Sequence, residues 1–513
     1  MRAHESHAGW IKGLLRPEAY PHRITELSLL ETHISWVILT GRFAYKIKKP
    51  VNLGFLDFST LALRHAFCLE ELRVNQRTAP GLYLDVVPIT GTPTQPVISG
   101  DGKAFEYAVR MQQFAGDAVF SQLASGGRIT EHCIDALAER LASFHNEVPP
   151  AGLETLFGSP ETVARAVEEN VSFLLRSAGS EEERRWLDEL DAWSRRQLQS
   201  LSQTLVRRRA GGYVRECHGD LHLGNLALIE GQPTPFDAIE FSPELRWIDI
   251  ISEVAFLTMD LEVHALTHLA YRFINRYEEI LGDYAGLSLW PFYCVYRALV
   301  RAKVARLTRA ATRDPADHER HDTAYRDYLS YAHRAITPRS PLLLITHGLS
   351  GSGKSTIAGR LAEKLGAIRV RSDVERKRLA TNLTGPNLYT ADMTRRTYAR
   401  LAEIASGLLG AGLSVIVDAT FLHAAERGQL RELAHRLHVP FRILDVDAPD
   451  ALLRERIAAR RRTAHDPSDA TATVLDRQRS EREPLLPQER DASLRIDGAA
   501  PDVDQALAAL RKL

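Results

Sequence analysis

Apolar and polar positions alternate along residues 43–48, which read FAYKIK. Successive side chains of a strand point to opposite faces, so this alternation places Lys46 and Lys48 together on one face. Similar patterns predict strands over residues 26–30, 34–40, 83–89 and 104–111. Residues 60–79 have helical spacing, with Ser59 or Thr60 as the N-cap. The first 111 residues are therefore predicted to form a strand-rich lobe that contains one helix.

The pattern then changes twice. Residues 116–210 and 250–335 have mostly helical spacing, until Pro338 and Pro341 interrupt it. The apolar run 342–347 is typical of a buried parallel strand, and further buried strands are expected over 367–370, 413–417 and 441–447. We therefore predict a first domain over residues 1–335, with lobes of about 1–111 and 114–335. A linker over 336–341 and a second domain over 342–513 follow.

The composition agrees with a multidomain globular protein. The chain has 513 residues, 44% of them hydrophobic and 25% charged, and its formal net charge is zero. A balanced charge gives no general attraction to polyanions. The four cysteines are widely spaced, which argues against a disulfide framework or a structural zinc site. Because the chain shows neither a signal-peptide core nor a run of eighteen apolar residues, we expect a cytoplasmic protein without a membrane span.

Four polar residues suggest phosphoryl-transfer chemistry in the first domain. His218-Gly219-Asp220 is followed by Asn225, and then by Asp237. Transfer to a hydroxyl uses one carboxylate to accept the proton, and an amide and a second carboxylate to hold Mg²⁺ against the nucleotide phosphates. Ordinary turns also favour Asp, Asn and Gly. Turns alone would not require His, Asp, Asn and Asp in this order and spacing.

This set resembles the protein-kinase motifs H-R-D-x-x-x-x-N and D-F-G. With Gly219 in place of Arg, and Asp237-Ala238-Ile239 in place of D-F-G, it is most similar to aminoglycoside phosphotransferases. The resemblance implies a bilobal, protein-kinase-like α+β domain. In it, Asp220 is the catalytic base beside His218, and Asn225 and Asp237 are metal ligands. Asp249 corresponds to a later aspartate that anchors the metal loop.

The resemblance also suggests nucleotide-binding residues. Phe43-Ala44-Tyr45-Lys46 parallels the kinase sequence V-A-I-K, so Lys46 is the candidate for the α- and β-phosphates, with Lys48 as the alternative. Glu71, or else Glu70, is expected to form the ion pair with that lysine. Met111, at the end of a predicted strand, begins the candidate adenine hinge. A G-x-G-x-x-G loop is missing, and the turn over 31–35 offers hydroxyl groups in its place.

A second phosphate-binding motif follows the linker. The segment GLSGSGKST matches G-x-x-x-x-G-K-[ST] between a predicted strand and a predicted helix, as a P-loop requires. Its backbone N–H groups would surround the phosphates at a helix N-terminus. Lys354 is expected to reach the β- and γ-phosphates, and Ser355 to bind Mg²⁺. The remaining predicted nucleotide contacts are Gly348, Ser350, Gly351, Ser352, Gly353 and Thr356.

The residues after the P-loop resemble P-loop kinases of the polynucleotide-kinase, zeta-toxin and gluconate-kinase type. The resemblance implies that Asp373 is a catalytic base, although it could also cap a helix. It further implies that Asp418 is a Walker-B-type carboxylate acting on Mg²⁺, and that Arg427 contacts substrate or phosphate. Arg456 and Arg460 lie in a stretch typical of a mobile lid, where they would neutralise the transferred phosphoryl group. A solvated basic helix face is the alternative.

Together the two halves resemble a bacterial bifunctional family in which an aminoglycoside-phosphotransferase-like domain is fused to a P-loop kinase-like domain. This implies an α/β P-loop domain with a parallel sheet and a lid, and two centres dependent on ATP and Mg²⁺. Each would transfer the γ-phosphoryl group to a hydroxyl of a small molecule. Two alternatives stay open: a regulatory nucleotide-binding protein with one non-catalytic site, and a P-loop half that phosphorylates a nucleic-acid or nucleotide hydroxyl.

Overall fold

The computed structural model describes residues 9–52, 54, 56–312, 314–338, 340–380, 390–463 and 471–511, without the side chains of 460–463. It divides into two compact units. The first comprises Met1–His264 and Phe292–Ile336, and the second comprises Ala265–Pro291 and Thr337–Leu513. The chain therefore enters the second unit twice. Within the described ranges, no helix has a stretch long and apolar enough to cross a membrane.

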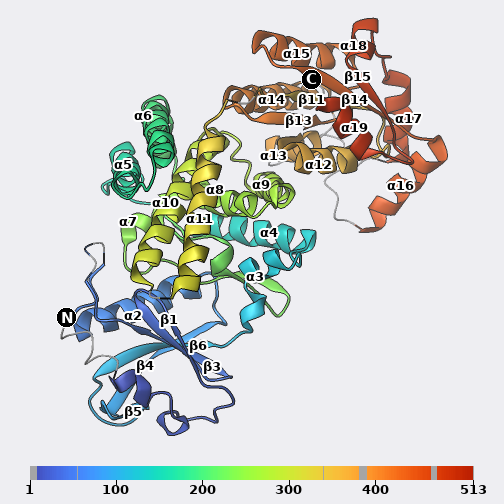
Figure 1. Cartoon of the computed structure of the whole chain (residues 1–513). Helices are drawn as coiled ribbons and strands as arrows, with labels where there is room; N and C mark the ends of the chain where they lie inside the picture. The colour runs from blue at the N-terminus through green and yellow to red at the C-terminus, as the bar shows by residue number, and fades with distance from the viewer. Residues whose placement is uncertain are drawn as a thin grey trace. The chain divides into compact units, whose positions relative to one another are not determined.

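The first unit begins with a six-stranded antiparallel sheet in the order β1-β2-β3-β6-β4-β5. The core on this sheet includes Trp10, Ile38 and Tyr45. The helix α2 lies against β4 and β6 of this sheet (Figure 1), and its Cys68 packs with Tyr83 and Val109. The bounds are β1 Ser28–Glu31, β2 Ser35–Leu39, β3 Phe43–Lys48, α2 Leu61–Gln76, β4 Tyr83–Thr92, β5 Gln95–Ile98 and β6 Glu106–Gln112.

The remainder of the first unit is mainly helical, as its sequence predicts. Two short antiparallel ladders, β7–β10 and β8–β9, interrupt the helices and carry the segment around His218. The helices are α3 Phe120–Ser125, α4 Glu131–Glu147, α5 Pro160–Arg176, α6 Glu181–Ala210, α7 Pro243–Arg246, α8 Ile250–Val263, α10 Trp290–Ala311 and α11 Pro315–Ala335. The strands are β7 Val214–Glu216, β8 Leu226–Ile229, β9 Gln232–Pro235 and β10 Trp247–Asp249.

The second unit contains a five-stranded parallel sheet in the order β12-β13-β11-β14-β15. Its strands are β11 Leu343–His347, β12 Ala367–Arg371, β13 Ser414–Asp418, β14 Phe441–Asp447 and β15 Ser493–Asp497. Its helices are α9 Thr267–Leu281, α12 Lys354–Leu365, α13 Ser372–Leu379, α14 Ala391–Gly410, α15 Ala424–Arg436, α16 Asp450–Thr463, α17 Ala472–Glu481, α18 Pro487–Asp491 and α19 Val503–Leu510. Leu344, Ile416 and Leu444 of the sheet form its core with Ile357 of α12.

Two features differ from the sequence-based expectation. The strands β5, β8, β9, β10 and β15 were not anticipated, and residues 265–291, assigned above to the first domain, belong to the second compact unit. The helical pattern of this segment gives no sign of the change. Its partners are the residues of α12 and β12, which lie about ninety positions further along the chain.

Candidate functional sites

Lys46 and Lys48 form a buried ion-pair cluster with α2. The Nζ atom of Lys46 lies 2.7 Å from Glu71 Oε1, and that of Lys48 lies 2.8 Å from Glu71 Oε2. Lys46 also pairs with Asp237, and Lys48 with Glu240. Both lysines and Glu71 are buried, whereas 42% of the Asp237 side chain is exposed. The cluster therefore opens to solvent at Asp237.

The structure shows that Glu71, and not its neighbour Glu70, pairs with the two lysines. Glu70 accepts hydrogen bonds from Arg73 and Arg246, while Glu71 bridges both lysines. Burial acts to raise the pKa of Glu71, but the charges of Lys46 and Lys48 outweigh it and lower this pKa to about 2. Burial acts to lower the pKa of Lys46, yet the surrounding carboxylates raise it well above its usual value. Both groups of this pair are charged at neutral pH.

The structure brings the four polar residues of the catalytic-loop motif together. The Asn225 side-chain amide donates to Asp220 Oδ2 at 2.9 Å, and the backbone of Asn225 accepts the Phe236 N–H at 2.9 Å. The His218 carbonyl accepts the Ile239 N–H at 3.1 Å, and His218 Nε2 lies 2.9 Å from the Phe236 carbonyl. The loop that carries Asp237 is thus tied to both sides of Asp220.

Backbone conformation explains two residues of this loop. Gly219 has φ +88°, and a Cβ atom there would lie 2.8 Å from the Leu245 carbonyl, so the position that is Arg in H-R-D accommodates only glycine here. Asp237 has φ +63°, which is unusual for a residue with a side chain. Hydrogen bonds from its N–H to Tyr83 Oη and from the Ala238 N–H to Asn75 hold this conformation. Such outliers are frequent at functional sites.

A polar network that the sequence analysis missed surrounds Asp220. His222 Nε2 lies 3.4 Å from Asp220 Oδ2, and Arg301 Nη1 lies 3.0 Å from the same imidazole nitrogen. Burial acts to raise the pKa of Asp220, but His222, Arg301 and His218 outweigh it and hold this pKa well below its usual value. His222 follows Asp220 by two residues and could have been noticed. Arg301 comes from the distant α10, so no local signal identifies it.

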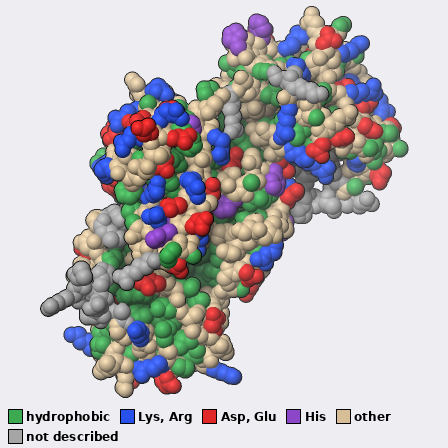
Figure 2. Space-filling model, viewed as in Figure 1, with side chains coloured by type: hydrophobic (Ala, Val, Ile, Leu, Met, Phe, Trp, Pro, Cys, Tyr) green, Lys and Arg blue, Asp and Glu red, His purple; other side chains and the backbone are tan. Residues whose placement is uncertain are grey.

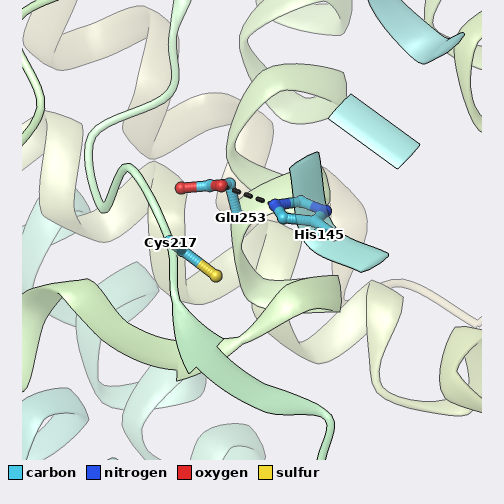
Figure 3. A group of neighbouring side chains, drawn as sticks. All are labelled: His145, Cys217 and Glu253. Atoms are coloured by element: carbon cyan, nitrogen blue, oxygen red, sulfur yellow. Dashed lines mark hydrogen bonds and ion pairs between the residues drawn. The ribbon is translucent and has the colours of Figure 1, made fainter. Parts of the chain in front are cut away.

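The segment around Gly219 is supported by a buried cluster of His145, Cys217 and Glu253 (Figure 3). Their potential metal-binding atoms lie within 4.8 Å of one another. However, Glu253 already accepts the Gly219 N–H at 2.7 Å and contacts His145 Nε2 at 2.7 Å. Burial raises the pKa of the Cys217 thiol well above its usual value. We interpret this cluster as support for the loop, because both carboxylate oxygens already have partners.

Asp249 has different contacts from those that the resemblance suggests, whereas Met111 lies near the end of a strand, as predicted. Asp249 pairs with Arg208 at 2.7 Å and accepts the Ile251 N–H, so it fixes the beginning of α8. Met111 lies within β6, opposite Ala44 of β3, because the strand continues to Gln112. Its partly buried side chain packs against the core cluster that contains Cys68 of α2 and Tyr83 of β4.

The P-loop of the second unit lines a cleft of about 130 Å³. Lys354 Nζ donates to the Leu349 carbonyl at 2.7 Å. Gly348 has φ +139°, and a Cβ atom there would lie 2.2 Å from the Val446 carbonyl, so this position requires glycine. The cleft lies at the carboxyl ends of β11, β12 and β13, where open α/β sheets bind ligands. The predicted site residues that line it are Ser350, Gly351, Gly353, Lys354, Ser355, Asp373 and Asp418.

Asp418 is suited to a divalent cation. Only 4% of this residue is exposed, and its buried Oδ2 has no hydrogen-bond partner within the described part of the chain. Arg371 Nε lies 3.7 Å from this oxygen, beyond hydrogen-bonding distance. A buried carboxylate oxygen without a partner is costly, and oxygen ligands are those that Mg²⁺ prefers. Ser355 and Asp418, which line the same cleft, therefore fit a magnesium site.

Other predicted residues lie away from the cleft. Gly348, Ser352, Thr356 and Arg456 are not among its lining residues. Arg456 donates to the backbone carbonyls of Gly351 and Gly498, so it holds the P-loop from outside the cleft. The side chain of Arg460 is outside the described residues. Arg427 is fully buried and pairs with Glu489. Its contacts are therefore internal to the domain, and its side chain does not reach a substrate.

Several lining residues were missed because each comes from a different helix. Tyr398 of α14 and Glu426 of α15 line the same cleft, together with Arg376 of α13, which follows Asp373 in the sequence motif. Burial raises the pKa of Glu426. From α17, Gln478 accepts the Ser350 N–H of the P-loop through its side-chain oxygen at 2.9 Å. These helices would contact an acceptor bound beside the phosphates.

Comparison with known proteins gives one family-model match and several relatives. The model described as "AAA domain" matches residues 343–485. A Mycobacterium tuberculosis protein, Rv2004c, is 31% identical over 466 residues, covering 88% of this chain and 90% of that protein. An adenylyl-sulfate kinase of Enterobacter sp. (strain 638) is 35% identical over 114 residues, covering 21% of this chain and 54% of that enzyme.

Solved structures similar to the chain include a gluconokinase from Sinorhizobium meliloti 1021, which is 24% identical with a TM-score of 0.26 and covers 34% of this chain and 94% of that chain. The Mycobacterium tuberculosis APS kinase CysC in complex with AMPPNP and APS is 22% identical with a TM-score of 0.26, covering 34% of this chain and 98% of that chain. The sequence motif, the cleft and the family-model match together show that the second unit contains a P-loop kinase-like domain.

Proposed function

Because the chain belongs to the same family as the Mycobacterium tuberculosis protein Rv2004c, which it matches through both units, we propose that it is a phosphotransferase with two centres. Each centre uses ATP and Mg²⁺ and transfers the γ-phosphoryl group to a hydroxyl of a small molecule. The main support is the cleft of the second unit, where Lys354, Ser355, Asp373 and Asp418 meet.

In the second centre, Lys354 neutralises the β- and γ-phosphates, and Asp373 accepts the proton of the acceptor hydroxyl. Ser355 and Asp418 hold Mg²⁺, which supplies charge neutralisation when bound. Lys354 now bonds a P-loop carbonyl, so phosphate binding replaces a neutral acceptor with an anionic one. A charge-assisted hydrogen bond is stronger than a neutral one, which favours this exchange.

In the first centre, Asp220 is the base and Asn225 and Asp237 are the groups that hold the metal ion. Lys46, which Glu71 holds in position, would contact the phosphates, and Asp237, its other partner, would hold the ion. The low pKa of Asp220 keeps it ionised and able to accept a hydrogen bond from a hydroxyl at neutral pH. His222 and Arg301, which lie beside Asp220, are the candidates for contacts with the acceptor.

A small polar acceptor suits the second cleft better than a polyanion. Its lining combines Arg371, Arg376 and Arg477 with Asp373, Glu426 and Glu481, so the charges balance. On the face drawn in Figure 2, basic and acidic side chains are intermixed over both units. A nucleic acid would favour a continuous basic area. The match to an adenylyl-sulfate kinase makes a nucleotide hydroxyl the second candidate acceptor.

Nucleotide binding tests both centres. We expect the full-length protein to bind two equivalents of a non-hydrolysable ATP analogue with Mg²⁺ in calorimetry, and Lys354→Ala to bind one. Loss of a charged hydrogen bond of roughly 1.5–3 kcal/mol would weaken the second site about 10- to 100-fold. Lys364→Ala is the control, because Lys364 lies on the same helix but is exposed and pairs with Asp504. Unchanged stoichiometry in Lys354→Ala would contradict the proposal for this centre.

The contact between Gln478 and the P-loop yields another prediction. The side-chain oxygen of Gln478 accepts the hydrogen bond of the Ser350 N–H. In a P-loop this N–H is a donor available to phosphate. We expect Gln478→Ala to bind the ATP analogue more tightly by roughly 2- to 10-fold, because one neutral hydrogen bond contributes about 0.5–1.5 kcal/mol. Titration of Lys354→Ala/Gln478→Ala would show whether the gain belongs to the second centre. Weaker binding in Gln478→Ala would mean that this amide helps to hold the nucleotide.

A further inference from the structure

The segment 265–291 is built into the edge of the parallel sheet. The strand β12 is an edge strand, and its outer side faces Asn275 of α9. The Arg369 N–H donates to Asn275 Oδ1 at 2.7 Å, and the Asn275 amide donates to the Ala367 carbonyl at 3.0 Å. An asparagine side chain thereby takes the place of a neighbouring strand. Arg272 of the same helix pairs with Glu363 of α12 at 3.0 Å.

One residue of α9 connects this edge to the P-loop cleft. Glu279 Oε1 pairs with Arg369 Nη2 at 2.5 Å, and Glu279 Oε2 lies 3.6 Å from Arg371 Nη1. Arg369 in turn donates to the Ser355 carbonyl at 2.9 Å. Arg371 Nε lies 3.7 Å from Asp418 Oδ2. Two arginines therefore link a nearly buried glutamate to Ser355, through its backbone carbonyl, and to the Asp418 carboxylate.

Arg371 lies close enough to Asp418 to affect what this carboxylate can bind. Its guanidinium lies between two buried carboxylates, at similar distances from both and in hydrogen-bonding contact with neither oxygen. Attraction between buried charges is strong, so a neutral side chain at position 279 would let Arg371 move towards Asp418. A bidentate arginine–carboxylate pair would then compete with a cation for the same oxygen. The charge of Glu279 counteracts this pairing.

We propose that Glu279 is a positioning residue of the second centre, which holds Arg371 away from Asp418 and so preserves the Mg²⁺ site. The inference rests on the proposed function, since the ion is the one that accompanies the nucleotide. It also means that residues 337–513 alone lack part of their own centre, because the missing helix is encoded in Ala265–Pro291, between the two segments of the first unit.

The test uses full-length protein with ADP and Mn²⁺, and bound Mn²⁺ is measured by electron paramagnetic resonance. The component lost in Lys354→Ala identifies the second centre. We expect Glu279→Gln to weaken that component about 10-fold or more, as removal of a charged partner implies. Metal-free ADP should bind within about 2-fold of wild type, because the phosphate-binding residues are unchanged. Arg272→Ala, which breaks another pair of α9, should leave the Mn²⁺ component intact.

A double variant separates positioning from folding. Removing Arg371 as well should restore Mn²⁺ binding, so we expect Glu279→Gln/Arg371→Met to bind Mn²⁺ within about 3-fold of wild type even if both variants melt at lower temperature. Wild-type Mn²⁺ affinity in Glu279→Gln, or no recovery in the double variant, would overturn the inference while the proposed function stands. If Lys354→Ala removes no component from wild type, the proposed function fails and the inference fails with it.

Discussion

Asp220→Asn is expected to lower phosphoryl transfer at the first centre by about 10²- to 10⁴-fold, the usual contribution of a positioned general base. An amide cannot accept the hydroxyl proton, although it preserves the shape of the side chain. Binding of the ATP analogue should change little, because the proposed role of Asp220 concerns the acceptor hydroxyl, whereas those of Asn225 and Lys46 concern the metal ion and the phosphates. Formation of phosphorylated product from a panel of hydroxyl compounds, followed by mass spectrometry, is the measurement.

The two centres can be separated by the same assay. Asp373→Asn should remove products of the second centre and leave those of the first, with the opposite pattern for Asp220→Asn. Asp85→Asn is the matched control, since Asp85 is a partly exposed partner of Arg110 in the sheet of the first unit. Full product yield in both Asp220→Asn and Asp373→Asn would exclude the two-centre phosphotransferase and favour a regulatory nucleotide-binding protein.

Glu71→Gln is expected to destabilise the first unit by about 3–5 kcal/mol, because it removes one partner from a buried ionic cluster. Lys46 and Lys48 would keep Asp237 and Glu240 but lose the carboxylate that joins them. Urea unfolding followed by tryptophan fluorescence measures the difference. Glu70→Gln should cost less, since 30% of that side chain is exposed and its arginine partners also contact Glu216.

The pH dependence of this effect has a defined sign. The pKa of Glu71 is about 2 in the folded protein and 4.5 as its ordinary value. A carboxyl group with a depressed folded-state pKa stabilises the protein fully above its unfolded pKa and loses that contribution as pH falls towards the folded value. The difference between wild type and Glu71→Gln should therefore be constant above about pH 5 and shrink between 4.5 and 2. A difference that grows on acidification would contradict the ion-pair assignment.

Local sequence was sufficient for much of the secondary structure. The alternation in FAYKIK predicts the strand Phe43–Lys48 and the shared face of its lysines, and both are confirmed by the structure. The P-loop with its strand and helix was also predicted, because the residues that define the motif lie in nine consecutive positions. For the same reason the segment from His218 to Asp237 could be recognised, since its parts lie within twenty positions.

Tertiary structure decided everything that depends on residues brought together from afar. The choice between Glu70 and Glu71 follows from which side of α2 faces β3, and the helical pattern of α2 leaves both possible. Arg301 and Glu279 reach their sites from helices whose sequences show only packing and charge. The placement of residues 265–291 beside β12 follows from hydrogen bonds at an exposed strand edge. These partners supply hydrogen bonds and charges that a site in the folded chain requires. No local sequence pattern indicates which distant segment will supply them.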